Sequence, residues 1–207
     1  STLTGHIQIH HKGYRNDPTI ENRITDPTVV KNALKEVLPE GASWTARVRL
    51  NAVASNARHS SGVTLVGIDP PSEASVSFIG TAVSKGRYLN PDDRNGIVIG
   101  AALMKKFDTR PGHKLVLMSQ DTHGEIASRA FRIVGIFKAE MEATEKQFVF
   151  VMRRASQKML GLGGGISEIS ILLPGKRDNR EVYHQLKTAL PSTEFEVNTW
   201  RELLPFQ

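Results

Sequence analysis

The chain has 207 residues, 39% of them hydrophobic, which is enough to bury the core of one or two domains. It carries 27 Lys and Arg residues against 21 Asp and Glu residues, a net charge of +6. This charge would suit an anionic partner such as lipid headgroups or nucleic acid, but the basic residues are scattered, which favours a solvated basic surface. The absence of cysteine excludes disulfides, thiolate metal sites and a cysteine nucleophile.

The N-terminal segment predicts a strand followed by a helix. Residues 6–11 alternate Ile7 and Ile9 with polar neighbours, which is the period of a half-buried strand. Further on, Asp26 and Pro27 have the pattern of an N-cap followed by proline at the first helical position. We therefore expect a helix to begin at this pair of residues.

The clearest strand pattern in the chain covers residues 44–54, where apolar and polar residues alternate. Arg47 and Arg49 both fall on the polar face of this strand, and we expect that face to be solvated. Residues 63–68 follow a polar link and predict the second arm of a hairpin, which ends at Asp69-Pro70-Pro71.

Residues 86–137 form a central block between two longer strand and helix patterns. The block contains a turn at 90–96, an apolar run at 97–99, an amphipathic segment at 101–107, a turn at 111–112 and two strand-like runs. Because the patterns on its two sides complete each other, we expect an inserted subdomain.

The C-terminal part predicts the order strand, helix, strand, helix, strand. An acidic connector at 139–145 is expected to be a loop or junction, and residues 148–151, 155–160, 166–173 and 195–199 continue the pattern. Asp178 with Glu181 resembles a capping box at the start of the second helix. With the N-terminal order of strand, helix, strand, strand, this predicts an α+β fold with helices on one side of a mixed sheet.

The histidines near the N-terminus are the first candidates for metal binding. On a strand, His6 and His10 share a face but lie about 13 Å apart, which is too far for one ion, and His11 faces the other way. We therefore interpret these residues as a polar strand face and predict no metal site.

Other motifs do not meet the requirements of the chemistry they suggest. The turn at 90–96 has Arg94 where a calcium ligand is needed, and the glycine cluster at 161–165 follows a helix instead of a strand. No G-x-S-x-G elbow occurs, although a hydrolase triad assembled by the fold stays possible. The sequence therefore predicts no catalytic residue and no cofactor. With 6% aromatic residues and no recognised nucleic-acid motif, it also predicts no nucleic-acid partner.

Five segments in order, at 66–70, 86–89, 97–103, 111–117 and 131–137, resemble the extracytoplasmic domain of FtsX-like ABC transporter permeases. Within that group the chain looks most similar to the lipoprotein-releasing permeases LolC and LolE, with the macrolide-exporter permease MacB more distant. The resemblance implies a porter-like mixed-sheet subdomain made of residues 1–75 and 146–207. A Sabre-like subdomain, residues 76–145, would be inserted between its two parts.

The resemblance also implies a function. The chain would be a non-enzymatic periplasmic domain of an inner-membrane permease, looped out between two transmembrane helices that precede Ser1 and follow Gln207. A separate cytoplasmic ATPase subunit would drive a permease dimer that moves a lipoprotein toward a periplasmic carrier. The alternatives are a MacB-like mechanotransmission domain for efflux, and an FtsX-like interaction module that controls a cell-wall hydrolase.

One loop is the candidate contact site for a partner. In LolC the corresponding loop is a proline-containing hook that captures the carrier, whereas the loop in this chain is short and has no proline. An ordinary hairpin turn at 121–124 is the alternative interpretation. The candidate partner loop consists of Gln120, Asp121, Thr122, His123, Gly124 and Glu125.

Overall fold

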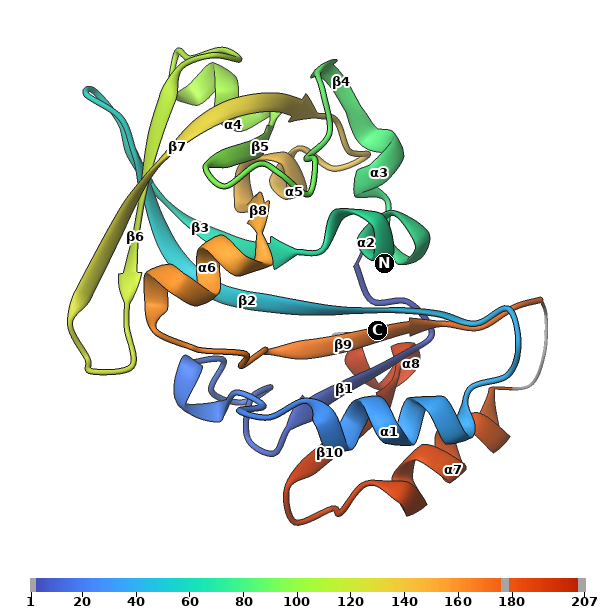
Figure 1. Cartoon of the computed structure of the whole chain (residues 1–207). Helices are drawn as coiled ribbons and strands as arrows, with labels where there is room; N and C mark the ends of the chain where they lie inside the picture. The colour runs from blue at the N-terminus through green and yellow to red at the C-terminus, as the bar shows by residue number, and fades with distance from the viewer. Residues whose placement is uncertain (1–2, 176–178, 205–207) are drawn as a thin grey trace.

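The computed structural model describes residues 3–175 and 179–204, which form two lobes (Figure 1). One long strand, β2 (Ser43–Ser55), runs through both lobes. The strands form one connected network in the order β10-β1-β9-β2-β3-β8-β5-β7-β4, with β6 pairing to β2 and β7. The predicted α+β class with a mixed sheet is confirmed.

The lower lobe is an antiparallel sheet of three short strands and the first residues of β2, with two helices on one face. The short strands are β1 (Ile7–His11), β9 (Glu168–Leu172) and β10 (Phe195–Thr199), and the helices are α1 (Thr28–Val37) and α7 (Arg180–Ala189). Alternate side chains of the strands, such as Ile9 and Ile169, pack with Leu34 and Leu186 of the helices in one apolar core.

The other face of the lower sheet is polar, yet it is buried as well. It carries Gln8 and His10 of β1, which are 4% and 3% exposed. Helix α2 (Pro70–Val76) lies over this face, and Asp69 caps it by accepting a hydrogen bond from Ser72 N. The prediction of a half-buried first strand is therefore wrong, because α2 and the terminal segments cover the face that was expected to be exposed to water. The prediction of helices on one side only is wrong as well, since α2 lies on the side opposite α1 and α7.

The upper lobe is a closed ring of strands. Starting from β2, each strand pairs with the next in the order β2, β3, β8, β5, β7, β6 and back to β2. The pairs β3–β8 and β5–β7 are parallel and the others are antiparallel. The strands are β3 (Ser60–Ile68), β5 (Gly96–Gly100), β6 (Lys114–Gln120), β7 (Ile126–Phe137) and β8 (Phe148–Met152).

The largest apolar core of the protein belongs to this ring. Side chains such as Leu65, Ile99, Leu117, Phe131 and Val149 are almost fully buried and pack together. Two helices that follow ring strands directly, α4 (Ala101–Lys106) and α6 (Arg153–Leu160), add to the same core. The predicted hairpin, central apolar run and amphipathic segment are confirmed as β2–β3, β5 and α4.

The remaining elements are short. They are η1 (Ile20–Asn22), α3 (Ile79–Ala82), β4 (Val83–Gly86), α5 (Glu142–Gln147) and α8 (Trp200–Leu203). Helix α5 corrects the expectation that residues 139–145 form only a loop. It forms because Glu145 accepts hydrogen bonds from Ala102 N and Ala139 N, which fix its position at the start of α4.

The starts of α1 and α7 differ from the sequence prediction. Helix α1 begins one residue later than expected, at Thr28, and Asp26 accepts a hydrogen bond from Thr28 N at 3.0 Å. The capping box that was expected at Asp178 lies outside the described residues, and α7 begins at Arg180.

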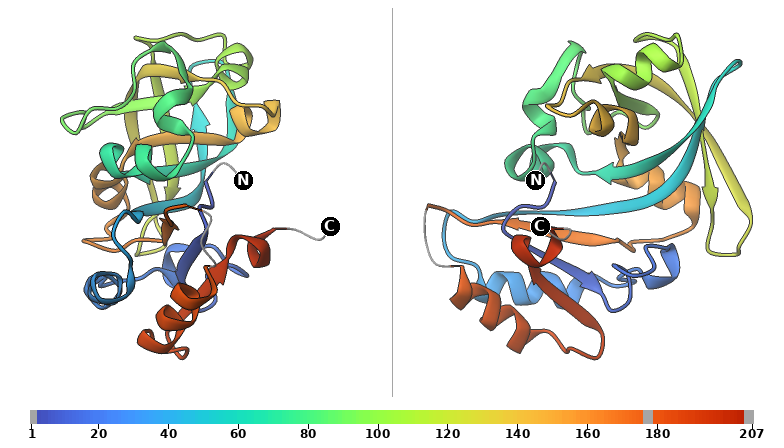
Figure 2. Two further views of the ribbon diagram at one scale, coloured as in Figure 1. Left: turned by 90° about the vertical axis from the view of Figure 1, so that its right-hand side faces the viewer. Right: turned by 180° about the vertical axis from the view of Figure 1, so that it is seen from behind.

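Helix α8 lies on the side of the molecule away from α1 (Figure 2). Trp200 N donates to His6 O at 2.9 Å, which ties the C-terminal helix α8 to the start of β1. The upper ring joins strands from residues 76–145 to strands from both flanks. The proposed subdomain boundaries at 75/76 and 145/146 stay a prediction.

Candidate functional site

The polar face of the lower sheet carries a buried set of charged and polar side chains, which we call the charge cluster: Gln8, His10, Arg47, Glu73, Glu168 and Ser170. They come from β1, β2, β9 and α2, so four separate segments of the chain meet there. Because period-two alternation turns every second side chain of a strand to one face, the strand pairing of β1, β9 and β2 brings their polar residues together.

Arg47 is the centre of the charge cluster and is completely buried. Its Nε and Nη2 atoms donate to the two carboxylate oxygens of Glu73, each at 2.8 Å. Its Nη1 atom donates to Glu168 Oε2 and Ser170 Oγ, both at 2.7 Å. This is the planar, bidentate pairing that stabilises a buried guanidinium, and four of the five N–H groups of Arg47 have an acceptor.

Glu168 receives further contacts from the other side. Gln8 Nε2 donates to Glu168 Oε2 at 3.3 Å, and His10 Nε2 lies 3.4 Å from Glu168 Oε1. Burial by itself would raise the pKa of Glu168, but Arg49, the His10 contact and Arg47 together outweigh it and hold that pKa well below its usual range. The carboxylate therefore stays charged in the interior.

The charge cluster corrects two expectations from the sequence. The face with Arg47 and Arg49 was expected to be solvated, yet Arg47 is 0% exposed and only Arg49 reaches solvent, with 32% of its side chain exposed. His10 was expected on a polar strand face with no carboxylate at useful spacing, but strand pairing places Glu168 opposite it. Among residues 3–175 and 179–204, no group of three or more His, Cys, Asp or Glu side chains could hold a metal ion.

The candidate partner loop is the tight turn between β6 and β7. Gly124 N donates to Asp121 O at 3.1 Å, and Asp121 Oδ1 accepts from His123 N and Glu125 N. Gly124 has a positive φ of 75°, which glycine adopts without strain. The loop therefore has the geometry of an ordinary hairpin turn, the alternative given by the sequence.

This loop is also attached to the body of the upper lobe. Thr122 N donates to Leu160 O, the last residue of α6, at 3.2 Å, and Gln120 Nε2 donates to Gly124 O at 3.2 Å. Helix α6 ends there because Gly161 adopts the left-handed conformation, with φ of 70°. Whether the loop contacts a partner stays a prediction.

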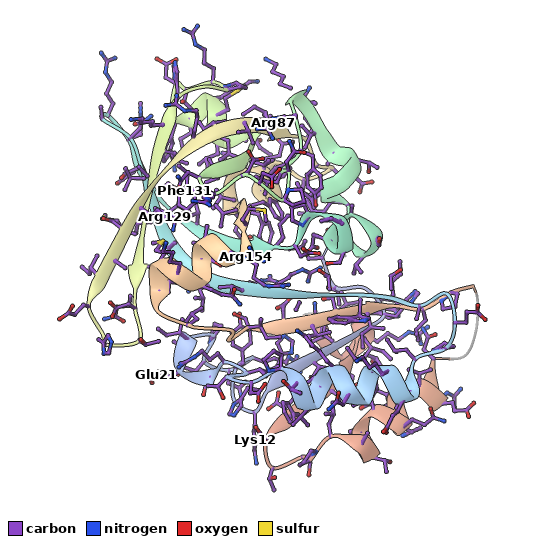
Figure 3. All side chains as sticks on the ribbon, viewed as in Figure 1. Lys12, Glu21, Arg87, Arg129, Phe131 and Arg154 are labelled. Atoms are coloured by element: carbon purple, nitrogen blue, oxygen red, sulfur yellow. The ribbon has the colours of Figure 1, made fainter. Side chains whose placement is uncertain are left out.

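Part of the loop borders a groove of about 460 Å³ with a mixed polar and apolar lining, which we call the hairpin groove. Its apolar residues include Ile20 of η1, Val53 of β2 and Met118 of β6. Glu21 lies at one edge of the groove, next to the tip of the β6–β7 hairpin (Figure 3). The structure thus brings Gln120, Asp121, Thr122 and Gly124 together with residues from the N-terminal part that were not predicted as site residues.

The sequence contained one signal for the charge cluster. Glu168 is the only charged residue in the run Ile166–Leu173, and a lone charge among strand-forming apolar residues indicates a buried and paired group. Strand β2 carries two charged residues, Arg47 and Arg49, so its pattern does not mark Arg47 in this way. What the sequence does not give is the partner, because Glu73 is 26 residues and Glu168 is 121 residues away from Arg47.

No helix in the described ranges is long and apolar enough to cross a membrane. The fold defines a class of domain: a mixed α+β protein in which an open sheet continues into a closed ring of strands. Known structures share this fold. The periplasmic region of MacB from Actinobacillus actinomycetemcomitans is 14% identical, with a TM-score of 0.64 over 98% of this chain and 92% of that one.

A second similar structure is the extracellular domain of the noncanonic ABC-type transporter YknZ from Gram-positive bacteria. It is 16% identical, with a TM-score of 0.62 over 93% of this chain and 98% of that one. No curated protein sequence matches the chain. At such low identity these two structures show a common fold.

The family is shown by the sequence itself, because the model of the MacB-like periplasmic core domain matches residues 1–189. The chain belongs to the MacB-like periplasmic core domain family. It is a periplasmic domain of an ABC transporter permease, and the domains of this family are non-catalytic parts of such permeases. The predicted FtsX-like and MacB-like resemblance and the periplasmic location are confirmed.

Proposed function

We propose that this domain moves as one rigid body and transmits movement between the membrane-embedded part of its permease and the periplasm. The observation that carries the proposal is the path of β2. This thirteen-residue strand pairs with β9 through Ser43–Arg47 in the lower lobe and with β3 through Val48–Ser55 in the upper lobe. The lobe that holds both chain ends is therefore joined to the upper ring by unbroken backbone.

The charge cluster supports the same role. Arg47 is the last residue of β2 that pairs with β9, and the next residue, Val48, pairs with β3. Its side chain connects β9 of the lower lobe to α2, the helix that follows β3. Because a buried pair leaves an uncompensated charge when it opens, bending the domain at this point would cost several kcal/mol, roughly 3–5.

The family implies an ABC transporter with an ATPase and a permease dimer. In our proposal the ATPase is a separate cytoplasmic subunit, and its movements reach the domain through the two chain ends. The domain then changes its position relative to the second permease subunit without changing its internal shape.

Distance measurements between spin labels test this proposal, and the absence of cysteine makes the domain a clean background for them. Labels at Lys31→Cys in α1 and Ile126→Cys in β7 report on the lower and upper lobes, since both side chains are exposed. In the full permease we expect the distance within one domain to stay the same on addition of ATP. The distance between the Ile126→Cys labels of two subunits should change.

Two results would contradict the proposal. One is an ATP-dependent change within a single domain, which would mean that the lobes move against each other. The other is a constant distance between the two domains throughout the ATPase cycle. Diluting labelled subunits with unlabelled ones separates the two kinds of distance.

The finer function expected from the sequence, release of lipoproteins in the manner of LolC and LolE, is a second candidate. The observation that favours it is the hairpin groove, whose apolar lining at Ile20, Val53 and Met118 could contact an acyl chain. The groove borders the candidate partner loop. With no proline and a tight turn geometry, the loop itself gives no support for carrier capture.

Photo-crosslinking in the full permease tests this candidate. A photoreactive residue at Val53, which is 40% exposed, should crosslink to a triacylated lipopeptide but not to the same peptide without acyl chains. A matched probe at Val29, on the outer face of α1 and 49% exposed, should crosslink to neither. Equal labelling of the two peptides, or equal labelling from both positions, would rule out an acyl-binding groove.

A further inference from the structure

A polar pocket of about 420 Å³ lies next to the charge cluster, on the face of the lower sheet opposite α1. We call it the polar pocket. It is lined by cluster residues Gln8, His10 and Glu168, and by side chains of the surrounding segments, among them Arg15 and Arg49. Thr4, which precedes β1, and Leu203 of α8 also line it, so residues from both terminal segments border the pocket.

The acceptors in this pocket already have partners. Glu168 Oε2 accepts from Arg47 and Gln8, and Glu168 Oε1 lies beside His10 Nε2. The hydroxyl of Tyr14 donates to the backbone oxygen of Arg49. A cationic ligand would therefore find no free carboxylate.

The donors, in contrast, have unused capacity. The Arg49 guanidinium is 3.9 Å from Glu168, beyond hydrogen-bonding distance, and stacks over the Phe148 ring at 5.4 Å with 32% of its side chain exposed. Arg15 is exposed and donates one hydrogen bond, from Nη2 to Glu202 O. Each guanidinium has further N–H groups that can bind an anion.

His10 provides an independent observation. Its ring is 3% exposed and stacks on Tyr14, yet its Nδ1 atom is buried without a hydrogen-bond partner. Buried polar atoms in folded proteins rarely stay unpaired, and an unpaired one calls for an explanation such as strain, a functional role or a bound water or ion. The pocket that Arg15 and Arg49 line is thus also lined by a histidine with a buried, unpaired ring nitrogen.

The net charge around the polar pocket is positive, which also favours an anionic ligand. Arg15, Arg47 and Arg49 contribute three positive charges, and Glu73 and Glu168 two negative ones, so the cluster and the pocket together carry a net charge of +1 with His10 neutral. We propose that the polar pocket binds a phosphate group, held by the guanidinium groups of Arg15 and Arg49.

Two sources of that group share this chemistry: the headgroup of an anionic phospholipid and a soluble phosphate. The position of the pocket beside both chain ends brings it close to the membrane surface if the ends continue into membrane helices, and for that source the inference rests on the proposed function. Anionic lipids attract arginines near the surface by about 1 kcal/mol each.

Binding of the purified 207-residue domain to vesicles and to inorganic phosphate tests the inference. The domain should co-sediment with vesicles of phosphatidylcholine and phosphatidylglycerol but not with vesicles of phosphatidylcholine alone. The variant R15Q/R49Q should weaken this binding by about tenfold or more. Inorganic phosphate should shift the amide resonances of Gln8, Arg15 and Arg49 and compete with the vesicles.

The matched control is R154Q/K158Q, which removes two positive charges from α6. Arg154 lies on the face turned toward the viewer in Figure 3, away from the chain ends. We expect this variant to keep most of the vesicle and phosphate binding. Thermal unfolding of both variants followed by circular dichroism distinguishes lost binding from lost structure.

Each result decides the question. Phosphate shifts at the pocket without vesicle binding would assign a soluble phosphate as the ligand and exclude the lipid. Equal losses in R15Q/R49Q and R154Q/K158Q, or no binding of either probe by the folded domain, would overturn the site. None of these readouts depends on ATP-driven movement, so the spin-label experiment on the permease can fail or succeed independently.

Discussion

Arg47 makes four hydrogen bonds to three partners in an interior that excludes water. Removing a guanidinium from water is expensive, and the cost is offset here because Glu73 pairs with it in bidentate geometry and Glu168 pairs from the other side. The arrangement is balanced only while all three charges are present. A change at any one of them leaves a buried charge without its partner.

The substitution Arg47→Met tests this balance. Methionine fills a similar volume but leaves the carboxylates of Glu73 and Glu168 without their main partner, so we expect the free energy of unfolding to fall by about 3–5 kcal/mol. Urea unfolding followed by circular dichroism measures it. The double variant Arg47→Met with Glu73→Leu should recover part of the loss, because it removes one of the stranded charges.

The control is the ion pair between Glu142 and Lys146, which has 3.5 Å between its charged atoms and 74% and 52% of its side chains exposed. Lys146→Met should change the free energy of unfolding by less than about 1 kcal/mol, because water screens an exposed pair. A loss for Arg47→Met as small as that for Lys146→Met would show that the buried pair contributes little.

The lowered pKa of Glu168 gives a prediction for acid stability. Its folded-state pKa lies below that of the unfolded chain, so the stabilisation is fully present above the unfolded value of about 4.3 and is lost as the pH falls toward the folded value. We expect the free energy of unfolding to fall more steeply below pH of about 4.3 in the wild-type domain than in Glu168→Gln. Parallel pH profiles for the two proteins would contradict this assignment.

The residue scale also shows why sequence reasoning placed Arg47 in solvent. Alternation in residues 44–54 correctly separates Arg47 from the apolar face, since Ala46 packs in the core under α1. It carries no information on what covers the other face. That depends on α2, a helix that the sequence analysis did not predict because Pro70-Pro71 was interpreted only as the end of a strand.

At the scale of elements, the junction between β5 and α4 is set by the close approach of α5. A Cβ atom on Gly100 would lie 2.0 Å from the backbone oxygen of Glu145. The side-chain carboxylate of the same residue accepts a hydrogen bond from Ala102 N at the start of α4. Only glycine allows strand β5, helix α4 and helix α5 to meet at this distance. The sequence predicted β5 and α4 from their patterns, but α5 was missed because its stretch has few apolar residues.

The substitution Gly100→Ala tests this junction. The new methyl group meets backbone atoms that cannot rotate away, so we expect a loss of about 1–3 kcal/mol or more in the free energy of unfolding. Gly62→Ala in β3 is the matched control, because a Cβ atom there would have nothing within 4 Å. Similar chemical denaturation midpoints for the two variants would mean that α5 moves aside without cost.

At the scale of the whole molecule, β2 connects two separate apolar cores. Val48 and Leu50 belong to the core of the upper ring, whereas Ala46 belongs to the core of the lower lobe. The sequence predicted the order of strands in both flanks, and the structure confirms it. The closure of the ring could not be predicted, because it requires β6 to pair with β2 across more than sixty residues of chain, from Val53 to Met118.

If β2 and the charge cluster couple the lobes, the domain should unfold as one unit. Under conditions in which amide hydrogen exchange reports the free energy of unfolding, Ile9 and Ile171 of the lower lobe should give the same value as Leu65 and Val149 of the upper ring. The variant Arg47→Met should lower all four values equally. A fall confined to Ile9 and Ile171 would show that the lobes are separate cooperative units. It would also weaken the proposal of rigid-body transmission, because lobes that unfold separately can also move relative to each other.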